Sequence, residues 1–486
     1  MKKISLLVFS LIVGALTFQS CEDLDDNAVP VSDFIWKGLN AYYLWQADVP
    51  ELADDRFANQ EELNNYLKAY NSPEQLFESL LYRRGEIDRF SVIFPDFTVL
   101  ENLLQGVAKS NGAEYGLRYV NPTGSAVFGY VRYILPDTDA ATKDIQRGDI
   151  FYAVNGVALT DTNYQSLLGA DTYTLNMATY APDGTITPNG REVTLTKAEY
   201  AENPVHTVNT FTQGGRNIGY LLYNGFYSNY DNNLNTAFNQ LKSAGVTDLV
   251  LDLRYNGGGS VRTATYLASM ITGQFNGQLF AKEQWNAKLQ AKYESQNPAA
   301  LQNLFTNQLS NSAAINSLNL NKVYILTTAS TASASELIIN CLKPYIEVVQ
   351  IGDTTTGKNV GSVTLYDSRD FSASGRSGSH KYAMQPIVIK VVNKNNFGEY
   401  SEGISPESDA NKLEEDYANL GILGNPAEPL FARAVALITG TGRFAAHTPA
   451  ITHKPFKDSK SMRRFGNEMY IEDMPEGYLN MVKDLQ

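Results

Sequence analysis

A serine and a lysine that stand 25 positions apart are the clearest candidates for chemistry in this chain. Ser333 follows the apolar run 322–326 and precedes apolar residues that recur at helical spacing. A second apolar run, 345–351, leads into the Gly-rich loop that carries Lys358. This order predicts a strand, a tight turn, a helix, a strand and a loop, with Ser333 at a helix start where backbone N–H groups favour negative charge. A serine hydroxyl needs a base, and a buried lysine with a lowered pKa can supply one.

Both residues also have a second interpretation. Ser333 and Glu336 fit a capping box, in which a serine and a glutamate satisfy backbone donors at a helix start, and a cap is the commoner use of such a pair. Residues 352–358 fit G-x-x-x-x-G-K, which is most of a phosphate-binding P-loop. Asn359, however, stands where a magnesium-binding Ser or Thr is needed, and residues 360–366 indicate loop and strand instead of the required helix. The sequence therefore disfavours nucleotide binding at this loop.

A glycine-rich turn follows another predicted strand, residues 247–253. A strand over 217–222 and a helical stripe over 234–241 precede it, and this order is typical of a parallel sheet covered by helices. The turn contains Gly257-Gly258-Gly259, whose missing Cβ atoms let backbone N–H groups approach a ligand. By itself the pattern fits either a ligand-facing loop or a tight turn between a strand and a helix.

Together these segments resemble the C-terminal processing (tail-specific) serine proteases, over residues 30 to 430 approximately. The resemblance is carried by the Ser-Ala-Ser-Glu helix start, the Gly-Lys loop and the segment Asp252–Gly259. The separation of nucleophile and base in that family matches the 25 positions between Ser333 and Lys358, which selects Ser333 over Ser335. The resemblance implies a serine endopeptidase with a Ser/Lys dyad that hydrolyses peptide bonds near protein C-termini.

The same resemblance implies roles for neighbouring residues. Backbone N–H groups of Gly258 and Ala334 would form the oxyanion hole, and Glu336 and Ser362 would support the dyad. Ser362 stands where the family often has a glutamine that orients the lysine, and its shorter side chain leaves that orientation open. His206 is the alternative base, because related tricorn-type enzymes place a histidine upstream of the core. The sequence has no H-E-x-x-H motif and no Cys/His spacing typical of a metal site, and no cofactor is expected.

A β-rich stretch over residues 101–198 resembles a PDZ domain. Residues 145–156 are the most recognisable part, and residues 191–195 would form the last strand. PDZ domains receive a peptide C-terminus by strand addition, with backbone N–H groups holding the carboxylate. Tyr115-Gly116-Leu117 would belong to the receiving loop and strand, so the resemblance implies that this domain captures the C-terminus of a substrate. The alternative is a small β-domain without a ligand.

The N-terminus is predicted to be a targeting segment. Lys2-Lys3 precedes an apolar run over 4–18 that is short for a membrane span. The run ends at a small residue before Cys21, which resembles a bacterial lipoprotein cleavage site and predicts lipid on Cys21. The acidic residues that follow resemble a surface-export signal of Bacteroidetes-type lipoproteins. We therefore expect an outer-membrane lipoprotein on the periplasmic or cell-surface side; an ordinary secretory signal is the alternative.

The composition is that of a globular protein, with 43% hydrophobic and 19% charged residues. A net charge of −13 argues against nucleic acid as a partner, and the expected partners are proteins or peptides with free C-termini and, through the lipid, a membrane. The second cysteine, Cys341, is predicted to be a small buried side chain. A non-catalytic peptide- or ligand-binding relative of the same fold is the alternative function, which the intact serine, lysine and glycine turn disfavour.

The expected fold is a multidomain α/β chain. Its protease core would resemble ClpP and crotonase, with an inserted or preceding PDZ-like β domain and an N-terminal helical subdomain. The predicted divisions are a lipoprotein signal peptide (1–21), an acidic tether (22–30), the helical subdomain (31–100), the PDZ-like domain (101–198), the protease core (205–430) and a C-terminal extension (431–486). The locally basic run Lys454–Arg464 in this extension is interpreted as solvated surface without a function.

Overall fold

The computed structural model describes residues 29–440 and 452–474. The predictions for the signal peptide, Cys21 and most of the acidic tether therefore lie outside the described residues. Within them, no helix is both long enough and apolar enough to cross a membrane.

A five-stranded sheet forms the centre of the core, in the order β10-β11-β12-β16-β17. Its strands are β10 (Val205–Gln213), β11 (Arg216–Tyr223), β12 (Asp248–Asp252), β16 (Lys322–Thr327) and β17 (Glu347–Gly352). All neighbours are parallel except the β10–β11 pair. The predicted buried strands are thus confirmed, because continuous apolar runs suit strands that are covered on both faces.

Helices cover both faces of this sheet. One face packs against α7 (Asp231–Ser243), α8 (Val261–Thr272) and α10 (Ala334–Leu342), and the other against α11 (Pro429–Thr439). Successive strand residues point to opposite faces, so Leu251 joins the first apolar cluster and Val250 the second. The predicted boundary at residue 430 falls inside α11, which packs on the core sheet.

A second, six-stranded sheet lies beside the core, in the order β13-β23-β18-β21-β14-β15. Its strands are β13 (Gly259–Ser260), β23 (Met469–Tyr470), β18 (Val360–Ser362), β21 (Ile387–Asn393), β14 (Leu279–Trp285) and β15 (Gln302–Leu304); α9 (Ala287–Gln296) follows β14. The strand β23 comes from the end of the chain and runs parallel to both of its neighbours. Since β18 begins two residues after Lys358, no helix follows the lysine and the P-loop interpretation fails.

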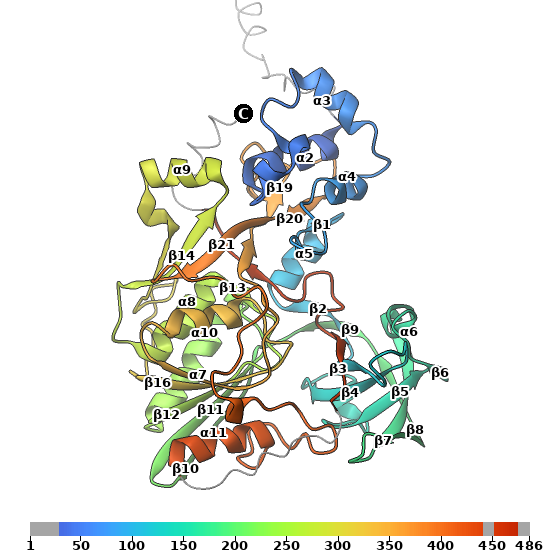
Figure 1. Ribbon diagram of the computed structural model, residues 1–486, viewed down its shortest axis with the longest axis vertical. Coiled ribbons are helices and arrows are strands. Elements are labelled where there is room, and N and C mark those ends of the chain that lie inside the picture. Colours follow the sequence, from blue (N-terminus) through green and yellow to red (C-terminus); the bar gives the residue numbers. More distant parts are fainter. Residues whose placement is uncertain (1–28, 441–451, 475–486) are drawn as a thin grey trace, which may run out of the picture.

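The N-terminal region is helical, as predicted. It contains α2 (Pro30–Tyr42), α3 (Gln60–Leu67) and α4 (Pro73–Ser79), which lie above the core in Figure 1. The helix α4 starts as expected, with Ser72 accepting the Gln75 N–H at 3.2 Å. A three-stranded sheet joins the region to the rest of the chain through β1 (Val92–Phe94), β20 (Ala383–Gln385) and β19 (Leu365–Tyr366). The predicted boundary at residue 100 falls inside α5 (Phe97–Leu104).

An inserted β domain, residues 107–201, stands beside the core (Figure 1). Its elements are β2 (Val107–Ser110), β3 (Ala113–Tyr119), β4 (Val127–Ile134), β5 (Ile150–Val154), β6 (Val157–Ala158), α6 (Tyr164–Gly169), β7 (Thr172–Tyr180), β8 (Ile186–Thr196) and β9 (Ala198–Ala201). The strand β2 pairs with β9, so the two ends of the insertion meet. At one edge of the main sheet a strand from the end of the chain, β22 (Pro455–Asp458), pairs antiparallel with β3.

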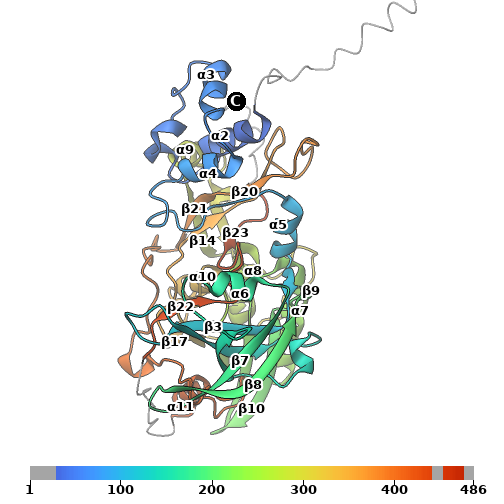
Figure 2. The same ribbon diagram turned by 90° about the vertical axis from the view of Figure 1, so that its right-hand side faces the viewer.

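The C-terminal segment, residues 452–474, is therefore part of two sheets. The solvated-surface interpretation of its basic run holds for Lys454, Lys457 and Arg464, which are exposed, but is wrong for Lys460 and Arg463. Figure 2 shows β22 alongside β3 and β23 near β14. Lys460 is only 7% exposed, and its ammonium contacts the Glu202 carboxylate at 3.0 Å. A run of charges indicates a solvated surface only when no distant carboxylate is available, and here the partner lies far back in the sequence.

Candidate active site

Ser333 occupies a strained turn between β16 and α10. Its φ of 64° and ψ of −115° are unusual for a residue with a side chain, and such strain concentrates at functional sites. The residue is fully buried, and its hydroxyl oxygen has no hydrogen-bond partner among the described residues. Ser335, by contrast, donates its hydroxyl to the Asn256 carbonyl at 3.1 Å. The geometry thus distinguishes the two serines, because only the Ser333 hydroxyl is uncommitted in this part of the described chain.

Glu336 connects the serine turn to the lysine loop. Its carboxylate accepts the backbone N–H groups of Ser333 at 2.7 Å, Gly357 at 2.7 Å and Lys358 at 2.8 Å, and the Thr355 hydroxyl also donates to it. Burial raises the pKa of Glu336, and these hydrogen bonds oppose that rise. The glutamate of the predicted capping box therefore does more than cap a helix, since it fixes both ends of the candidate dyad.

Lys358 is completely buried, yet its amino group is engaged elsewhere. Nζ donates to the Asn467 carbonyl at 2.8 Å and to the Glu468 carboxylate at 2.5 Å. It also lies 4.4 Å from the centre of the Phe90 ring. Burial lowers the pKa of Lys358, and the Glu468 carboxylate opposes this by favouring the ammonium. Burial raises the pKa of Glu468 to about 7, against the opposing charge of Lys358.

The glycine turn lies directly on the serine turn. A Cβ on Gly258 would stand 2.6 Å from the Ser333 Cβ and 3.0 Å from the Ala334 nitrogen, so only glycine allows this approach. The Gly258 N–H, a predicted oxyanion donor, donates here to the Asn256 side-chain oxygen at 2.9 Å. The next N–H, that of Gly259, donates to the Glu468 carbonyl oxygen. In this structure two N–H groups of the turn are therefore already hydrogen-bonded, one to Asn256 and one to the C-terminal segment.

A buried ion-pair network supports the glycine turn from behind. Arg254, with no exposed surface, contacts Asp252 at 2.9 Å and Glu428 at 2.6 Å. Removing one partner of such a buried pair typically costs about 3–5 kcal/mol, because the other charge is left uncompensated. The network thus holds the turn after β12 against the start of α11.

Other predicted residues lie away from the dyad. The Ser362 hydroxyl donates to the Met469 carbonyl at 3.3 Å, and not to Lys358. His206 lies with its ring 5.1 Å from that of Tyr133, and its Nδ1 is 2.9 Å from the Thr207 hydroxyl. Tyr115-Gly116-Leu117 lies on β3 and meets the C-terminal segment. Cys341 is fully buried in the apolar core, which confirms that prediction.

Two contacts at the lysine were not predicted from the sequence. Asp88 is buried and accepts the N–H groups of Phe90 and Ser91, which places the Phe90 ring over the Lys358 amine. In sequence, Asp88-Arg89-Phe90-Ser91 resembles the closing motif of the family's N-terminal region, but that resemblance did not indicate a contact with the lysine. Glu468 had no comparable signal, because an isolated glutamate in a polar tail is ordinary in sequence.

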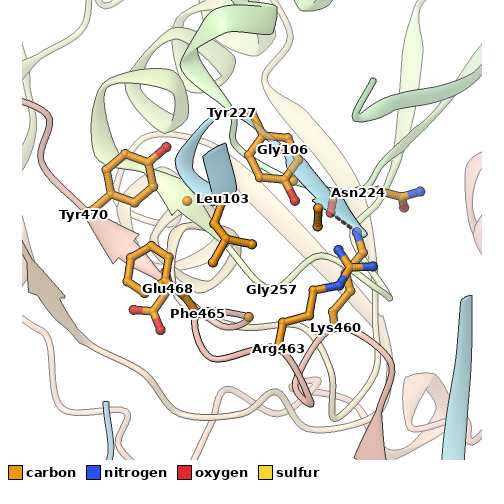
Figure 3. A pocket seen from close by; sticks show the side chains of 15 residues that line it. Leu103, Gly106, Asn224, Tyr227, Gly257, Lys460, Arg463, Phe465, Glu468 and Tyr470 are labelled. Carbon is orange, nitrogen blue, oxygen red and sulfur yellow. Dashed lines mark hydrogen bonds between the residues drawn. The ribbon is translucent and has the colours of Figure 1, made fainter. Parts of the chain in front are cut away.

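The cavity at the glycine turn is small. In Figure 3, Glu468, Phe465 and Tyr470 lie to the left of Leu103, whereas Arg463 and Lys460, which also belong to the C-terminal segment, lie to its right. Its volume of about 40 Å³ holds a few water molecules at most. Among residues 29–440 and 452–474, no cluster of His, Cys, Asp and Glu could hold a metal ion.

Comparison with known proteins assigns the chain to a family. The profile of peptidase family S41 matches residues 217–374, and the profile of the S41 N-terminal domain matches residues 31–92. The chain belongs to peptidase family S41. The S41 match contains both Ser333 and Lys358, and the second match ends just after the Asp88 turn.

Relatives agree with this assignment. A carboxyl-terminal-processing protease from Picosynechococcus sp. is 25% identical over 230 residues, which cover 46% of this chain and 50% of that protein. A chloroplastic C-terminal processing peptidase from Tetradesmus obliquus is 26% identical over 263 residues, with 50% and 51% covered. The chain thus spans about half the length of these curated relatives. A solved structure of a candidate S41 protease from Bacteroides fragilis is 27% identical, covers 84% of this chain and 98% of that chain, and has a TM-score of 0.64.

Proposed function

We propose that this S41 family member is a serine endopeptidase in which Ser333 is the nucleophile and Lys358 the base. The observation that carries the proposal is the uncommitted, buried hydroxyl at a strained strand-to-helix turn. Glu336 joins that turn to the lysine loop through hydrogen bonds to both residues. Spatial connection of a nucleophile to a buried amine is what a Ser/Lys dyad requires.

The proposed chemistry begins with a neutral lysine. Lys358 takes the proton from the Ser333 hydroxyl while the serine oxygen attacks the carbonyl carbon of the scissile peptide bond. The Gly258 and Ala334 N–H groups then stabilise the oxyanion, and one such donor is worth roughly 100-fold or more in rate. Lys358 returns the proton to the leaving amine, and water hydrolyses the acyl-enzyme. For this step the Gly258 N–H must turn away from Asn256.

The proposed substrates are proteins or peptides with free C-termini. The relatives' names describe C-terminal processing, and the inserted β domain presents β3, whose edge accepts an additional strand. In this proposal the domain is PDZ-like and Tyr115-Gly116-Leu117 receives the terminal carboxylate. His206 has no role in the dyad, because its ring contacts Tyr133 and its Nδ1 contacts Thr207.

The proposed location is the outer membrane, with lipid on Cys21 as the anchor and the folded chain on the periplasmic or cell-surface side. The arrangement of Lys2-Lys3, an apolar run and a lone cysteine after a small residue supports this proposal.

The experiment compares cleavage of matched peptides with free and amidated C-termini by the wild type and by Ser333→Ala. We expect cleavage of the free form, slower cleavage of the amidated form, and none by the variant. A non-catalytic relative would bind the free peptide and cleave neither form. Turnover by Ser333→Ala at the wild-type rate would refute the assignment of the nucleophile.

A further inference from the structure

The C-terminal segment occupies the strand-addition edge of the inserted β domain. β22 pairs antiparallel with β3, with Asp458 opposite Gly116. The Phe456 ring lies 5.1 Å from the Tyr119 ring of β3 and 4.9 Å from the Tyr164 ring of α6, so it fills the space between strand and helix. An edge strand offers one row of unpaired backbone groups, and this segment uses it.

The end of β22 meets the backbone group that would receive a terminal carboxylate. The Tyr115 N–H donates to the Ser459 hydroxyl oxygen at 3.1 Å, and the Ser459 N–H donates to the Tyr115 carbonyl at 2.9 Å. The chain does not end there but continues towards the core. A peptide with a free C-terminus could not take this position while the segment is present.

Two basic residues then guide the segment from the β domain to the core. The Arg463 guanidinium donates to Glu114 at 2.6 Å. The Lys460 ammonium contacts Glu202 at 3.0 Å and donates to the Asn224 carbonyl at 2.7 Å, a contact drawn in Figure 3. These partners lie on β3 and on the two loops that lead into and out of β10–β11. Two charges of the basic run, those of Lys460 and Arg463, are thus paired with carboxylates along the path between the two sites.

The segment finally fills the catalytic cleft. The Asn467 carbonyl and the Glu468 carboxylate hold the Lys358 amine, and the Glu468 carbonyl accepts the Gly259 N–H. β23 then runs between β13 and β18, which places a peptide strand beside the glycine turn. The cavity that remains at the glycine turn is lined by neither Ser333 nor Lys358, and its volume of about 40 Å³ is too small for a second peptide.

We propose that the C-terminal segment is an intramolecular pseudosubstrate that closes both the peptide-binding edge and the catalytic cleft, and that wild-type activity comes only from the fraction of molecules in which the segment has left. The inference rests on the proposed function, since it assigns the state of the same dyad. In the closed state the carboxylate of Glu468 stabilises the lysine as an ammonium, which cannot accept the serine proton. One segment thereby covers the peptide-binding edge, fills the catalytic cleft and keeps Lys358 protonated.

A structural strand would need only its backbone hydrogen bonds and apolar side chains. This segment instead brings a carboxylate to a buried lysine, at a desolvation cost that ion pairing only partly offsets. The Phe456 ring lies between β3 and α6, and the Ser459 hydroxyl accepts the Tyr115 N–H, as groups of a bound peptide would. These contacts copy ligand contacts, which indicates an occupant that can exchange with substrate.

The first test uses the full chain with Glu468→Gln and Phe456→Ala, singly and together. Glu468→Gln removes one partner of a buried ion pair, and Phe456→Ala removes the ring contacts with Tyr119 and Tyr164. Each change weakens the closed state, so cleavage of a short free peptide should rise at least about tenfold in each single variant. Hydrogen exchange of the amides in β22 and β23 should accelerate in parallel. The matched control is Asp473→Asn, which removes a charge from the same segment at a side chain that is 86% exposed and should stay within about twofold of wild type.

The second test separates this inference from the proposed function. A fluorescein-labelled synthetic peptide of residues 453–472 is titrated against Ser333→Ala, with and without Glu468→Gln and Phe456→Ala. Tight binding only to the opened variant supports the inference even if no cleavage is ever observed, in which case the proposed function fails alone. Equal binding to both proteins, or unchanged exchange together with an unchanged cleavage rate in the first test, would overturn the inference.

Discussion

Asp458 is the residue whose replacement should release the C-terminal segment most selectively. Its carboxylate contacts Arg132 of β4 at 3.1 Å and accepts the Ser330 hydroxyl at 2.7 Å and the Ser461 N–H at 2.6 Å. Ser330 lies three residues before Ser333, so one carboxylate joins the β domain, the serine turn and the segment. Asp458→Asn keeps the shape of the side chain and removes the charge.

The size of the effect follows from the pKa of Asp458. Burial alone would raise it, but the Arg132 charge and the hydrogen bonds from Ser461 and Ser330 lower the pKa from 3.8 to about 2. A shift of nearly two units corresponds to about 2.4 kcal/mol, so the closed state should weaken by up to about 60-fold in Asp458→Asn at neutral pH. Because the folded pKa is lowered, this contribution is present above pH 4 and is lost as the pH falls towards 2.

The assay is hydrogen exchange of the β22 amides at neutral pH, together with cleavage of a short peptide. We expect exchange to accelerate by up to about 60-fold. Cleavage should rise as well, until release of the segment no longer limits its rate. The control is Lys457→Gln, which removes a charge from the same strand at an exposed side chain and should leave exchange unchanged. If Asp458→Asn exchanges like Lys457→Gln, the carboxylate does not hold the segment and the reasoning from its pKa is refuted.

The remaining predictions concern the dyad and the lipid anchor. Each dyad variant is made both in the wild-type chain and in the chain opened by Glu468→Gln and Phe456→Ala. Ser333→Ala should abolish cleavage while Ser335→Ala keeps measurable turnover, since only Ser333 has an uncommitted hydroxyl there; the reverse order would reassign the nucleophile. Because burial lowers the pKa of Lys358, the rate in the opened chain should rise with pH through that lowered value, and Lys358→Arg should be inactive, since a guanidinium cannot deprotonate. An active Lys358→Arg with an inactive His206→Ala would replace the dyad by a histidine mechanism. In cells fed a palmitate analogue, the wild-type protein should be labelled and Cys21→Ala should not. Wild-type protein that is unlabelled and found in the soluble fraction would indicate an ordinary secretory signal.

Local sequence determined the core elements and the identity of the candidate catalytic residues. The strand–turn–helix around Ser333 and the strand before Lys358 could be predicted from apolar periodicity and glycine placement, because these signals depend on only a few neighbouring residues. The same locality explains why the capping-box glutamate could be named, although its hydrogen bonds to the lysine loop could not.

Only the tertiary structure decided what the end of the chain does. Lys460 and Glu468 are ordinary charged residues in sequence, and their partners Glu202 and Lys358 lie 258 and 110 positions away. The boundaries at residues 100 and 430 were misplaced for a related reason, since α5 and α11 each pack across the division that composition suggested. Ion pairs and strand pairing join residues that are far apart in sequence, so they produce no periodic pattern along the chain. The roles of β22 and β23 therefore became visible only in the tertiary structure, where β22 pairs with β3 and β23 lies beside the glycine turn.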